Sequence, residues 1–492
     1  RGARGRDPDV SPPEARETVV GPYVAPAGAI PTLDVPDLTG IREVHMIGIG
    51  GAGMRNLARL FLARGISVSG SDMKESTGLD ELRAAGASVF VGHDAGRLGE
   101  PDAVVISSAI RAENVELSEA RSRGIPVWAR AQALAAAAAD RLEIAVAGTH
   151  GKTTTTAMIA LVLDRAGLDP TYVIGGDPNE SGSGAHAGDG ELFVTEADES
   201  DGSFLVGRPA IGVVTNVEVD HVDFYPGGSG EIEAAFTAFA DRCDRVVVAF
   251  DDPGATRAVA ASGTPKVTYG VGDEADVRLS IISPGPGGAR GTILLEGRMH
   301  ELGLTVDGAH NLLNATAVVA VATLVGVPAE QAVEALAGFG GVHRRFEHRG
   351  SVRGAAFFDD YGHVPTELAV TLDVARRTAP DRLIAVFQPH RYSRTQALWR
   401  ELGHSLVEAD VIVVTDVYGA AQDPIPGVTG KLVVEGIADA GSDKRVVYLP
   451  HRNDIVTFLE REVRSGDLVI TMGCGDVWML GDATLERIGG SA

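Results

Sequence analysis

The residue types best suited to phosphate chemistry are clustered in residues 148–154, Gly-Thr-His-Gly-Lys-Thr-Thr. Glycine N–H groups can approach phosphate oxygens, lysine can neutralise the outer phosphates of a nucleotide, and a threonine hydroxyl can bind Mg²⁺. The common motif Gly-x-x-x-x-Gly-Lys would require glycine at position 146, where the chain has Val146. We therefore interpret residues 148–154 as a shortened nucleotide loop, and a solvated turn is the alternative.

This loop needs a strand before it and a helix after it. Residues 144–147 are an apolar run typical of a buried strand, and the apolar pattern after Lys152 predicts a helix that ends at Gly167. A strand followed by a loop and a helix is the setting in which backbone N–H groups and the helix dipole face phosphate. The context therefore favours nucleotide binding over a solvated turn.

A second glycine-rich loop, Gly48-x-Gly50-x-x-Gly53, follows an expected strand that begins at Glu43. Asp72 lies 24 positions after Gly48, at the end of the next expected strand. This arrangement is typical of a dinucleotide-binding site, although a tight turn that needs glycine only for packing is the alternative. Two such loops in one chain suggest that the protein binds two nucleotides. One would be the part of the substrate by which the protein holds it, and the other would supply energy.

Two further strands are expected to bring metal ligands to the sheet edge that carries Lys152. Residues 192–195 lead to Glu196, and residues 211–215 lead to His221. A structural histidine is the alternative for His221. For Asp198, Glu199 and Asp201, which follow Glu196, the sequence favours an acidic helix N-terminus.

Polar residues also follow expected strands in the last third of the chain, at residues 355–358, 383–387 and 411–415. Strand ends of this kind form the binding crevice of an open α/β sheet. Arg391 and Arg394 could clamp a phosphate or carboxylate, and a surface ion pair is the alternative. Asn311 either caps a helix or contacts adenine, and the sequence alone favours the cap.

The composition limits the possible functions. The chain has 492 residues and a net charge of −24, which disfavours binding to nucleic acid or to an anionic membrane. The two cysteines are too few for a disulfide framework or a zinc site, and no apolar run is long enough to span a bilayer, so we expect a cytoplasmic protein. Oligomeric state is left open between monomer and dimer.

The length and the alternating pattern predict an α/β protein of three domains. We expect a Rossmann-like domain at residues 38–141, a central P-loop-type domain with a mostly parallel sheet at 142–341, and a C-terminal Rossmann-like domain at 342–492. Residues 1–37, rich in proline, glycine and charge, are expected to be a disordered tail.

Taken together, the motifs resemble those of the Mur ligases of peptidoglycan synthesis, over about residues 40–480. The short phosphate loop is that family's own form. The resemblance rests on six segments in the family's order: Val44–Met54, Ala147–Thr154, Glu196–Asp201, Thr215–His221, Asp359–His363 and Phe387–Thr395.

The resemblance implies ATP-driven amide ligation, with ATP and Mg²⁺ as cofactors. The γ-phosphoryl group of ATP would pass to the carboxylate of UDP-N-acetylmuramate, and the amine of L-alanine would displace phosphate from the resulting acyl phosphate. The third domain would close over the substrates and exclude water. A peptide-recycling ligase of the same superfamily, a non-catalytic nucleotide-binding regulator and an NAD-dependent dehydrogenase are the alternatives.

The resemblance also implies a role for individual residues, with residues 38–141 binding the UDP substrate. The expected catalytic residues are Lys152, Glu196, His221, Arg345, His363, Arg391 and Arg394, of which Glu196 and His221, with Thr153, would bind Mg²⁺. The expected ATP-binding residues are Gly148, Thr149, His150, Gly151, Lys152, Thr153, Thr154, Asn311, Asn314, Arg345 and Asp360. The residues expected to bind the UDP substrate are Gly48, Gly50, Gly51, Gly53, Met54, Asp72, Ser107, Ser108 and His390. The chain departs from the family pattern at Arg55, Asn56, Ala309, Val364, Gln422 and residues 183–186.

Overall fold

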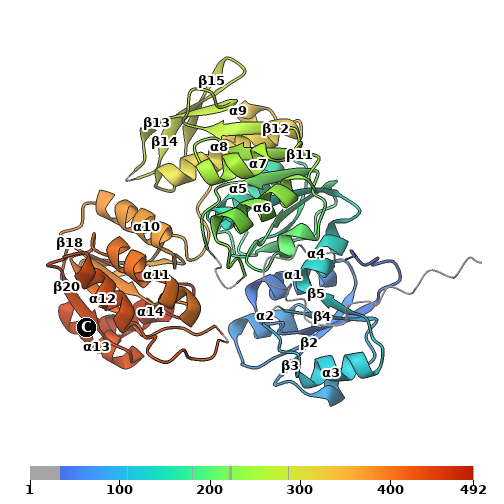
Figure 1. Cartoon of the computed structure of the whole chain (residues 1–492), viewed down its shortest axis with the longest axis horizontal. Helices are drawn as coiled ribbons and strands as arrows, with labels where there is room; N and C mark the ends of the chain where they lie inside the picture. The colour runs from blue at the N-terminus through green and yellow to red at the C-terminus, as the bar shows by residue number, and fades with distance from the viewer. Residues whose placement is uncertain are drawn as a thin grey trace, which may run out of the picture.

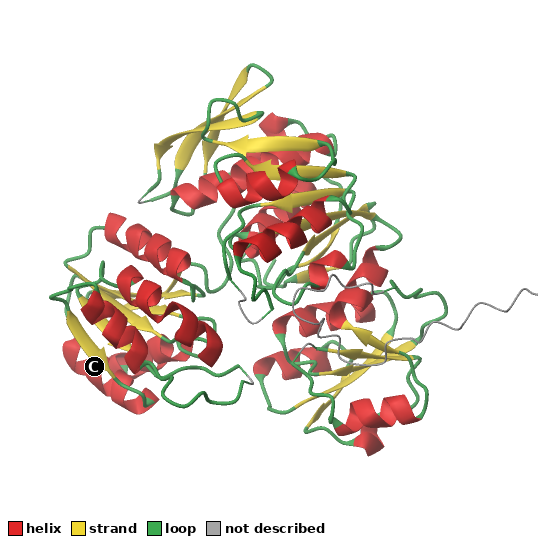
Figure 2. Cartoon of the chain, in the orientation of Figure 1, coloured by secondary structure: helices red, strands yellow, loops and turns green. Residues whose placement is uncertain are grey.

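The computed structural model describes residues 34–107, 109–179, 181–220, 224–285, 287–420 and 422–490. Three units follow one another along the chain, each with its own sheet (Figure 1). Figure 2 shows helices flanking the strands in each unit. The predicted α/β class and three-domain organisation are confirmed. The predicted domain boundaries stay predictions, although each sheet falls within one predicted range, and residues 1–33 of the predicted tail lie outside the described part of the chain.

The N-terminal unit is a parallel sheet of order β3-β2-β1-β4-β5. Its elements are β1 (Glu43–Ile47), α1 (Ala52–Ala63), β2 (Ser67–Asp72), α2 (Thr77–Ala84), β3 (Ser88–Val91), β4 (Ala103–Ile106), α3 (Val115–Ser122), β5 (Val127–Ala129) and α4 (Arg130–Ala138). Chain order reverses at β1, which lies between β2 and β4, and a ligand crevice is expected at the carboxyl end of such a strand. The glycine-rich loop follows β1 at this point.

The central unit has ten strands in the order β15-β14-β13-β12-β11-β10-β6-β9-β7-β8. Its strands are β6 (Leu142–Ala147), β7 (Thr171–Val173), β8 (Ala185–His186), β9 (Leu192–Glu196), β10 (Ile211–Val214), β11 (Arg245–Ala249), β12 (Lys266–Gly270), β13 (Val277–Ser283), β14 (Arg290–Leu295) and β15 (Arg298–Gly303). Its helices are α5 (Lys152–Arg165), α6 (Ser229–Ala240), α7 (Pro253–Ala260), α8 (Ala309–Leu324) and α9 (Ala329–Leu336). The sheet is parallel from β7 to β13, as predicted, and antiparallel at β8, β14 and β15. Because β10, β6 and β9 are parallel neighbours, the loops after them meet at one edge.

The C-terminal unit has six strands in the order β16-β17-β21-β18-β19-β20, of which only β16 is antiparallel to its neighbour. Its elements are β16 (Glu347–Val352), β17 (Ala355–Asp360), α10 (Pro365–Arg377), β18 (Arg382–Phe387), α11 (Tyr392–Ser405), β19 (Val411–Val414), α12 (Lys431–Asp439), β20 (Arg445–Tyr448), α13 (Arg452–Glu462), β21 (Asp467–Met472) and α14 (Trp478–Gly489). Over the described parts of the chain, none of the helices combines the length and the apolar character needed to cross a bilayer.

The N-terminal and central units share an apolar core, which the C-terminal unit does not join in the described parts of the chain. Val173 and Phe193 of the central unit belong to the same buried cluster as Met46, Leu57 and Phe61 of the N-terminal unit. The two clusters of the C-terminal unit are made of that unit's own residues, 346–485, in the described parts of the chain. The first two units therefore share a core, and the C-terminal unit has its own.

Candidate active site

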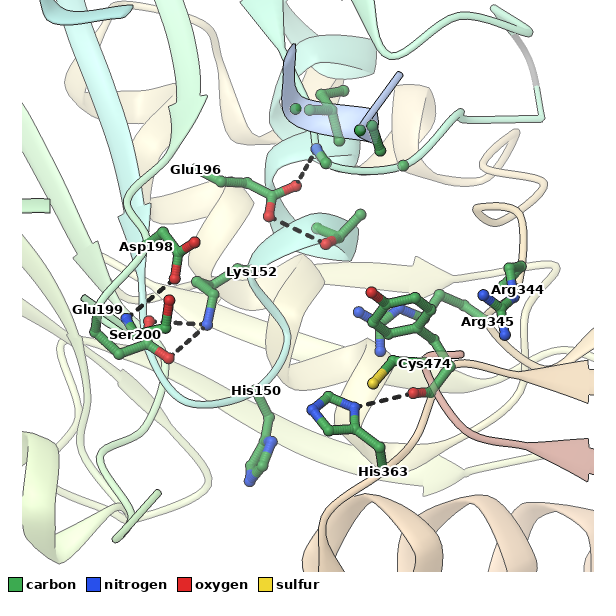
Figure 3. A pocket seen from close by; sticks show the side chains of 18 of the residues that line it. His150, Lys152, Glu196, Asp198, Glu199, Ser200, Arg344, Arg345, His363 and Cys474 are labelled. Carbon is green, nitrogen blue, oxygen red and sulfur yellow. Dashed lines mark hydrogen bonds and ion pairs between the residues drawn. The ribbon is translucent and has the colours of Figure 1, made fainter. Parts of the chain in front are cut away.

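A cavity of about 580 Å³ is lined by residues from all three units. The N-terminal unit contributes its glycine-rich loop, the central unit its phosphate loop and acidic loop, and the C-terminal unit the loops after β17 and β18. Figure 3 shows Lys152 and Glu196 of the central unit facing Arg345 and His363 of the C-terminal unit across this space. The predicted site residues that line the cavity are Gly51, Gly53, Met54, Ser107, Thr149, His150, Gly151, Lys152, Thr153, Glu196, Arg345, His363, His390, Arg391 and Arg394.

The phosphate loop connects β6 to α5, as predicted. Gly151 immediately precedes the helix and has a φ of 81°. Gly148 has a φ of 138°, and a Cβ there would lie 2.0 Å from Thr215 Oγ1, so a larger residue would displace the neighbouring strand. Lys152 Nζ lies 2.9 Å from the Glu199 carboxylate and also donates to Gly148 O. Burial acts to lower the pKa of Lys152, but Glu199 and Asp198 outweigh burial and raise it.

Glu196 lies at the end of β9, next to the phosphate loop. Its Oε1 accepts a hydrogen bond of 2.6 Å from Gly175 N, and its Oε2 accepts one of 3.2 Å from Thr153 Oγ1 (Figure 3). Burial raises the pKa of Glu196. The structure thus brings together the two described members of the predicted Mg²⁺ site.

The interpretation of the acidic segment as a helix N-terminus was wrong. Asp198, Glu199 and Asp201 lie in a loop that leads only to the single turn Ser203–Leu205. Glu199 pairs with Lys152, and Asp198 lies 3.5 Å from Arg130 Nη2. The acidic residues therefore complement cations of the cavity instead of a helix dipole.

Oxygen ligands such as the Thr153 hydroxyl and the Glu196 carboxylate suit Mg²⁺. The partly buried Glu196 carboxylate accepts two hydrogen bonds from the residues that the structure describes, and its remaining lone pairs can take a cation. His221, the third predicted ligand, lies outside the described residues. Within the described ranges, no group of three or more His, Cys, Asp or Glu side chains is arranged to hold a metal ion.

A second cavity of about 660 Å³ lies between the central and C-terminal units and includes Thr154, Asn311, Asn314 and Asp360 in its lining. The interpretation of Asn311 as a helix cap was wrong, because α8 begins at Ala309 and Gly308 is its N-cap. Asn311 Nδ2 donates to Asp307 O at 2.7 Å. Asp360 accepts hydrogen bonds from Gly362 N, Thr371 Oγ1 and Phe346 N, and burial raises its pKa. Four residues, His150, Gly151, Arg345 and Glu367, line both cavities.

Arg394 makes a buried contact between two units. Its Nε and Nη2 lie 3.1 Å from the two carboxylate oxygens of Asp220 in the central unit. The alternative of an ion pair therefore holds for Arg394, although the pair is buried and not on the surface. Arg391 precedes α11 with a φ of 65° and donates its backbone N–H to Tyr418 O. Burial lowers the pKa of His363 to about 4.

In the N-terminal unit, the glycine-rich loop packs against the end of β2. Gly50 N donates to Asp72 Oδ2 at 2.9 Å, and Gly48 N donates to Ser71 O. A Cβ at Gly50 would lie 2.8 Å from Asp72 Oδ2, which explains the glycine. Asp72 therefore stabilises the conformation of the glycine-rich loop through its hydrogen bond with Gly50. Ser107 lines the cavity, and Ser108 lies outside the described residues.

Four carboxylates of the site were not among the predicted site residues: Glu199, which was assigned to a helix N-terminus, and Glu218, Asp220 and Glu367. Glu218 and Asp220 lie in the loop after β10, and Glu367 lies in the first turn of α10. Each follows a strand end that the sequence analysis had singled out, and this position was the available signal. Their partners lie far away in the sequence and left no local pattern.

Family profiles match the chain in three consecutive segments. They are the Mur ligase family, catalytic domain, at residues 43–142, the Mur ligase middle domain at 146–322, and the Mur ligase, glutamate ligase domain at 344–475. A UDP-N-acetylmuramate–L-alanine ligase from Renibacterium salmoninarum is 49% identical over 459 residues, which are 92% of this chain and 97% of that protein. One from Thermobifida fusca is 46% identical over 461 residues, covering 91% and 97%.

Solved structures agree with these matches. A crystal structure of UDP-N-acetylmuramate–alanine ligase from Thermotoga maritima has a TM-score of 0.79 and 29% identity, and covers 92% of this chain and 100% of that one. A murein peptide ligase from Psychrobacter arcticus has a TM-score of 0.72 and 26% identity, covering 92% and 99%. The sequence profiles, the identities and the shared architecture agree over nearly the whole described chain, and the protein belongs to the Mur ligase family.

Proposed function

We propose that this protein is an ATP-dependent ligase of the cytoplasm that joins L-alanine to the carboxylate of UDP-N-acetylmuramate in peptidoglycan precursor synthesis. The observation that carries the proposal is the cavity into which the glycine-rich loop, the phosphate loop and the C-terminal cations all project. A reaction that joins two substrates at the expense of ATP needs these three components at one place. The names of the relatives support the choice of substrates.

In the proposed reaction, the substrate carboxylate attacks the γ-phosphorus of ATP, the bond to the bridging oxygen breaks, and ADP leaves. The nitrogen of L-alanine then attacks the acyl carbon, loses a proton, and expels phosphate. Lys152 would exchange its carboxylate partner Glu199 for the outer phosphates, and Arg345 would stabilise negative charge that develops between the two cavities. Thr153 and Glu196 would hold Mg²⁺, which would neutralise phosphate charge.

The second candidate is a ligase that attaches a recycled peptide to the same sugar nucleotide, which the similarity to a murein peptide ligase favours. The two functions differ in the size of the amine substrate. The test measures phosphate release with ATP, Mg²⁺ and UDP-N-acetylmuramate, and compares three additions: L-alanine, a murein tripeptide as the recycled peptide, or no amine. Our proposal requires faster release with L-alanine and a product heavier by one alanyl residue. Release that responds only to the tripeptide would favour the second candidate.

A further inference from the structure

Glu367 is a point of contact between three residues that the sequence analysis assigned to the site. Its Oε1 lies 3.2 Å from His150 Nδ1 and 3.9 Å from Arg345 Nη1. Its Oε2 accepts a hydrogen bond of 2.9 Å from His363 N. His150 belongs to the phosphate loop of the central unit, whereas Arg345 and His363 belong to the C-terminal unit. One carboxylate therefore joins the two halves of the ATP site.

The local fold keeps this carboxylate in place. Pro365 starts α10, and Glu367 lies in the first turn, where the helix dipole stabilises negative charge. The Glu367 side chain is only 14% exposed. Burial acts to raise the pKa of Glu367, but His363, His150 and Arg345 outweigh burial and hold the pKa well below its usual range. Glu367 is thus an ionised group whose cationic neighbours near neutral pH are His150 and Arg345, because burial lowers the pKa of His363 to about 4.

Each ring nitrogen of His150 contacts a carboxylate, Nδ1 that of Glu367 and Nε2 that of Glu218. Its Nε2 lies 3.1 Å from Glu218 Oε2, and this carboxylate oxygen also accepts a hydrogen bond of 2.8 Å from Thr366 Oγ1. The two neighbouring residues Thr366 and Glu367 of α10 thereby dock onto the phosphate loop and the loop after β10. Burial alone would lower the pKa of His150, but the hydrogen bonds to Glu218 and Glu367 and their charges raise it to about 9.

The contact lies at the boundary between the two cavities. His150, Gly151, Arg345 and Glu367 line both the 580 Å³ cavity and the 660 Å³ cavity. If ATP occupies the second cavity and the sugar nucleotide the first, the phosphoryl group passes this boundary. The two cations His150 and Arg345 come from different units and converge here through one carboxylate.

We infer that Glu367 is a positioning residue for phosphoryl transfer: it aligns the His150 ring and the Arg345 guanidinium at the boundary between the cavities, and so couples the C-terminal unit to the phosphate loop. The inference rests on the proposed function. Glu367 acts through its two partners, and its carboxylate has no role in bond formation. Loss of its charge should leave the two cations without the anion that aligns them with each other, while His150 keeps its contact with Glu218.

The test is Glu367→Gln, which keeps the shape of the side chain and removes its charge. The matched control is Glu462→Gln, because Glu462 is also a carboxylate of the C-terminal unit that pairs with two cations, Arg382 and Arg445, outside both cavities. We expect Glu367→Gln to lower kcat/KM for ATP by about 10- to 100-fold and the control to leave it unchanged. Glu367→Asp should restore part of the loss.

A second readout does not depend on turnover. In protein labelled with ¹³C-histidine, the His150 signal, assigned with His150→Gln, should titrate near pH 9 in the unaltered chain. It should titrate at a clearly lower pH in Glu367→Gln. Glu218 and Glu367 are the carboxylates on the ring, and Arg345 and His363 are the other titratable groups around Glu367.

The outcomes are distinct for the two proposals. An unaltered chain that releases no alanine-dependent phosphate would overturn the proposed function, and the His150 titration would still test the role of Glu367. An active chain in which Glu367→Gln changes neither kcat/KM nor the His150 titration would overturn the inference. If Glu367→Gln does not fold, Glu367→Asp decides, because its shorter carboxylate must lower both kcat/KM and the His150 pKa.

Discussion

Asp220 and Arg394 form a two-pronged ion pair that joins the central unit to the C-terminal unit, with both oxygen–nitrogen distances at 3.1 Å. The two side chains are 8% and 6% exposed. Both charges are largely removed from water, so their attraction to each other is screened less than that of a surface pair. Asp220 also directly precedes His221, one of the expected metal ligands. The ion pair therefore connects the position of the C-terminal unit with the loop after β10.

The first prediction concerns this pair. Arg394→Gln should lower kcat/KM by about 100-fold, because it leaves a buried carboxylate without its cation and removes a cation from the cavity. Asp220→Asn introduced together with Arg394→Gln should be less harmful than the sum of the two single changes. A double-mutant cycle on kcat/KM measures this coupling, and strict additivity would show that the pair does not act as a unit.

Lys152 gives the second prediction. Lys152→Ala should reduce phosphate release by about 100-fold or more, because the outer phosphates lose their cation. Lys444→Ala is the control, since Lys444 pairs with Asp410 outside both cavities. Circular dichroism should be unchanged in both variants. Turnover that survives in Lys152→Ala would mean that ATP binds elsewhere.

The third prediction concerns the metal. Glu196→Gln should raise the Mg²⁺ concentration needed for half-maximal activity by about 10- to 100-fold, because an amide is a weaker ligand than a carboxylate. Chelation with EDTA should abolish turnover of the unaltered chain, and added Mg²⁺ should restore it. A titration of activity against Mg²⁺ makes the comparison. Equal Mg²⁺ requirements in the two proteins would remove Glu196 from the metal site.

Stability should depend on pH through His150, as a fourth prediction. The folded chain raises the pKa of His150 from its ordinary value of 6.5 to about 9. The stabilising contribution is therefore complete below about pH 6.5 and is lost as the pH rises through about 9. The loss should amount to no more than about 3 kcal/mol. Unfolding midpoints of the unaltered chain and His150→Gln, measured from pH 6 to 10, should converge at high pH, whereas a constant difference would contradict the assignment.

Much of the fold could be predicted because short apolar runs are a local signal. The strands predicted at residues 192–195 and 383–387 lie within β9 and β18, and both glycine-rich loops follow strands as expected. No strand was predicted in residues 277–303, which form β13 to β15. Val277 and Leu279 pack in the same core as Val318 of α8, so long-range packing stabilises β13 there.

Site residues that belong to a local sequence motif could be predicted. Contacts made between residues of two different units could not. Thr153 and Glu196 were expected to meet and do so, because both follow neighbouring parallel strands. Glu367 could not be found from the sequence, since its partner His150 lies 217 positions away. Asn311 was misinterpreted because capping preference is local, whereas Gly308 sets the actual start of α8.

Because the first two units share an apolar core and the third has its own, the cost of separating the units differs between the two boundaries. Pulling the N-terminal unit from the central unit would expose the cluster that contains Val173 and Phe193 to water, at a cost proportional to the apolar area. Tilting the C-terminal unit breaks polar contacts such as Asp220–Arg394, and water can hydrate their charges as they separate. We therefore expect the C-terminal unit to move relative to the other two at a lower cost in free energy than the N-terminal and central units would need to separate from each other.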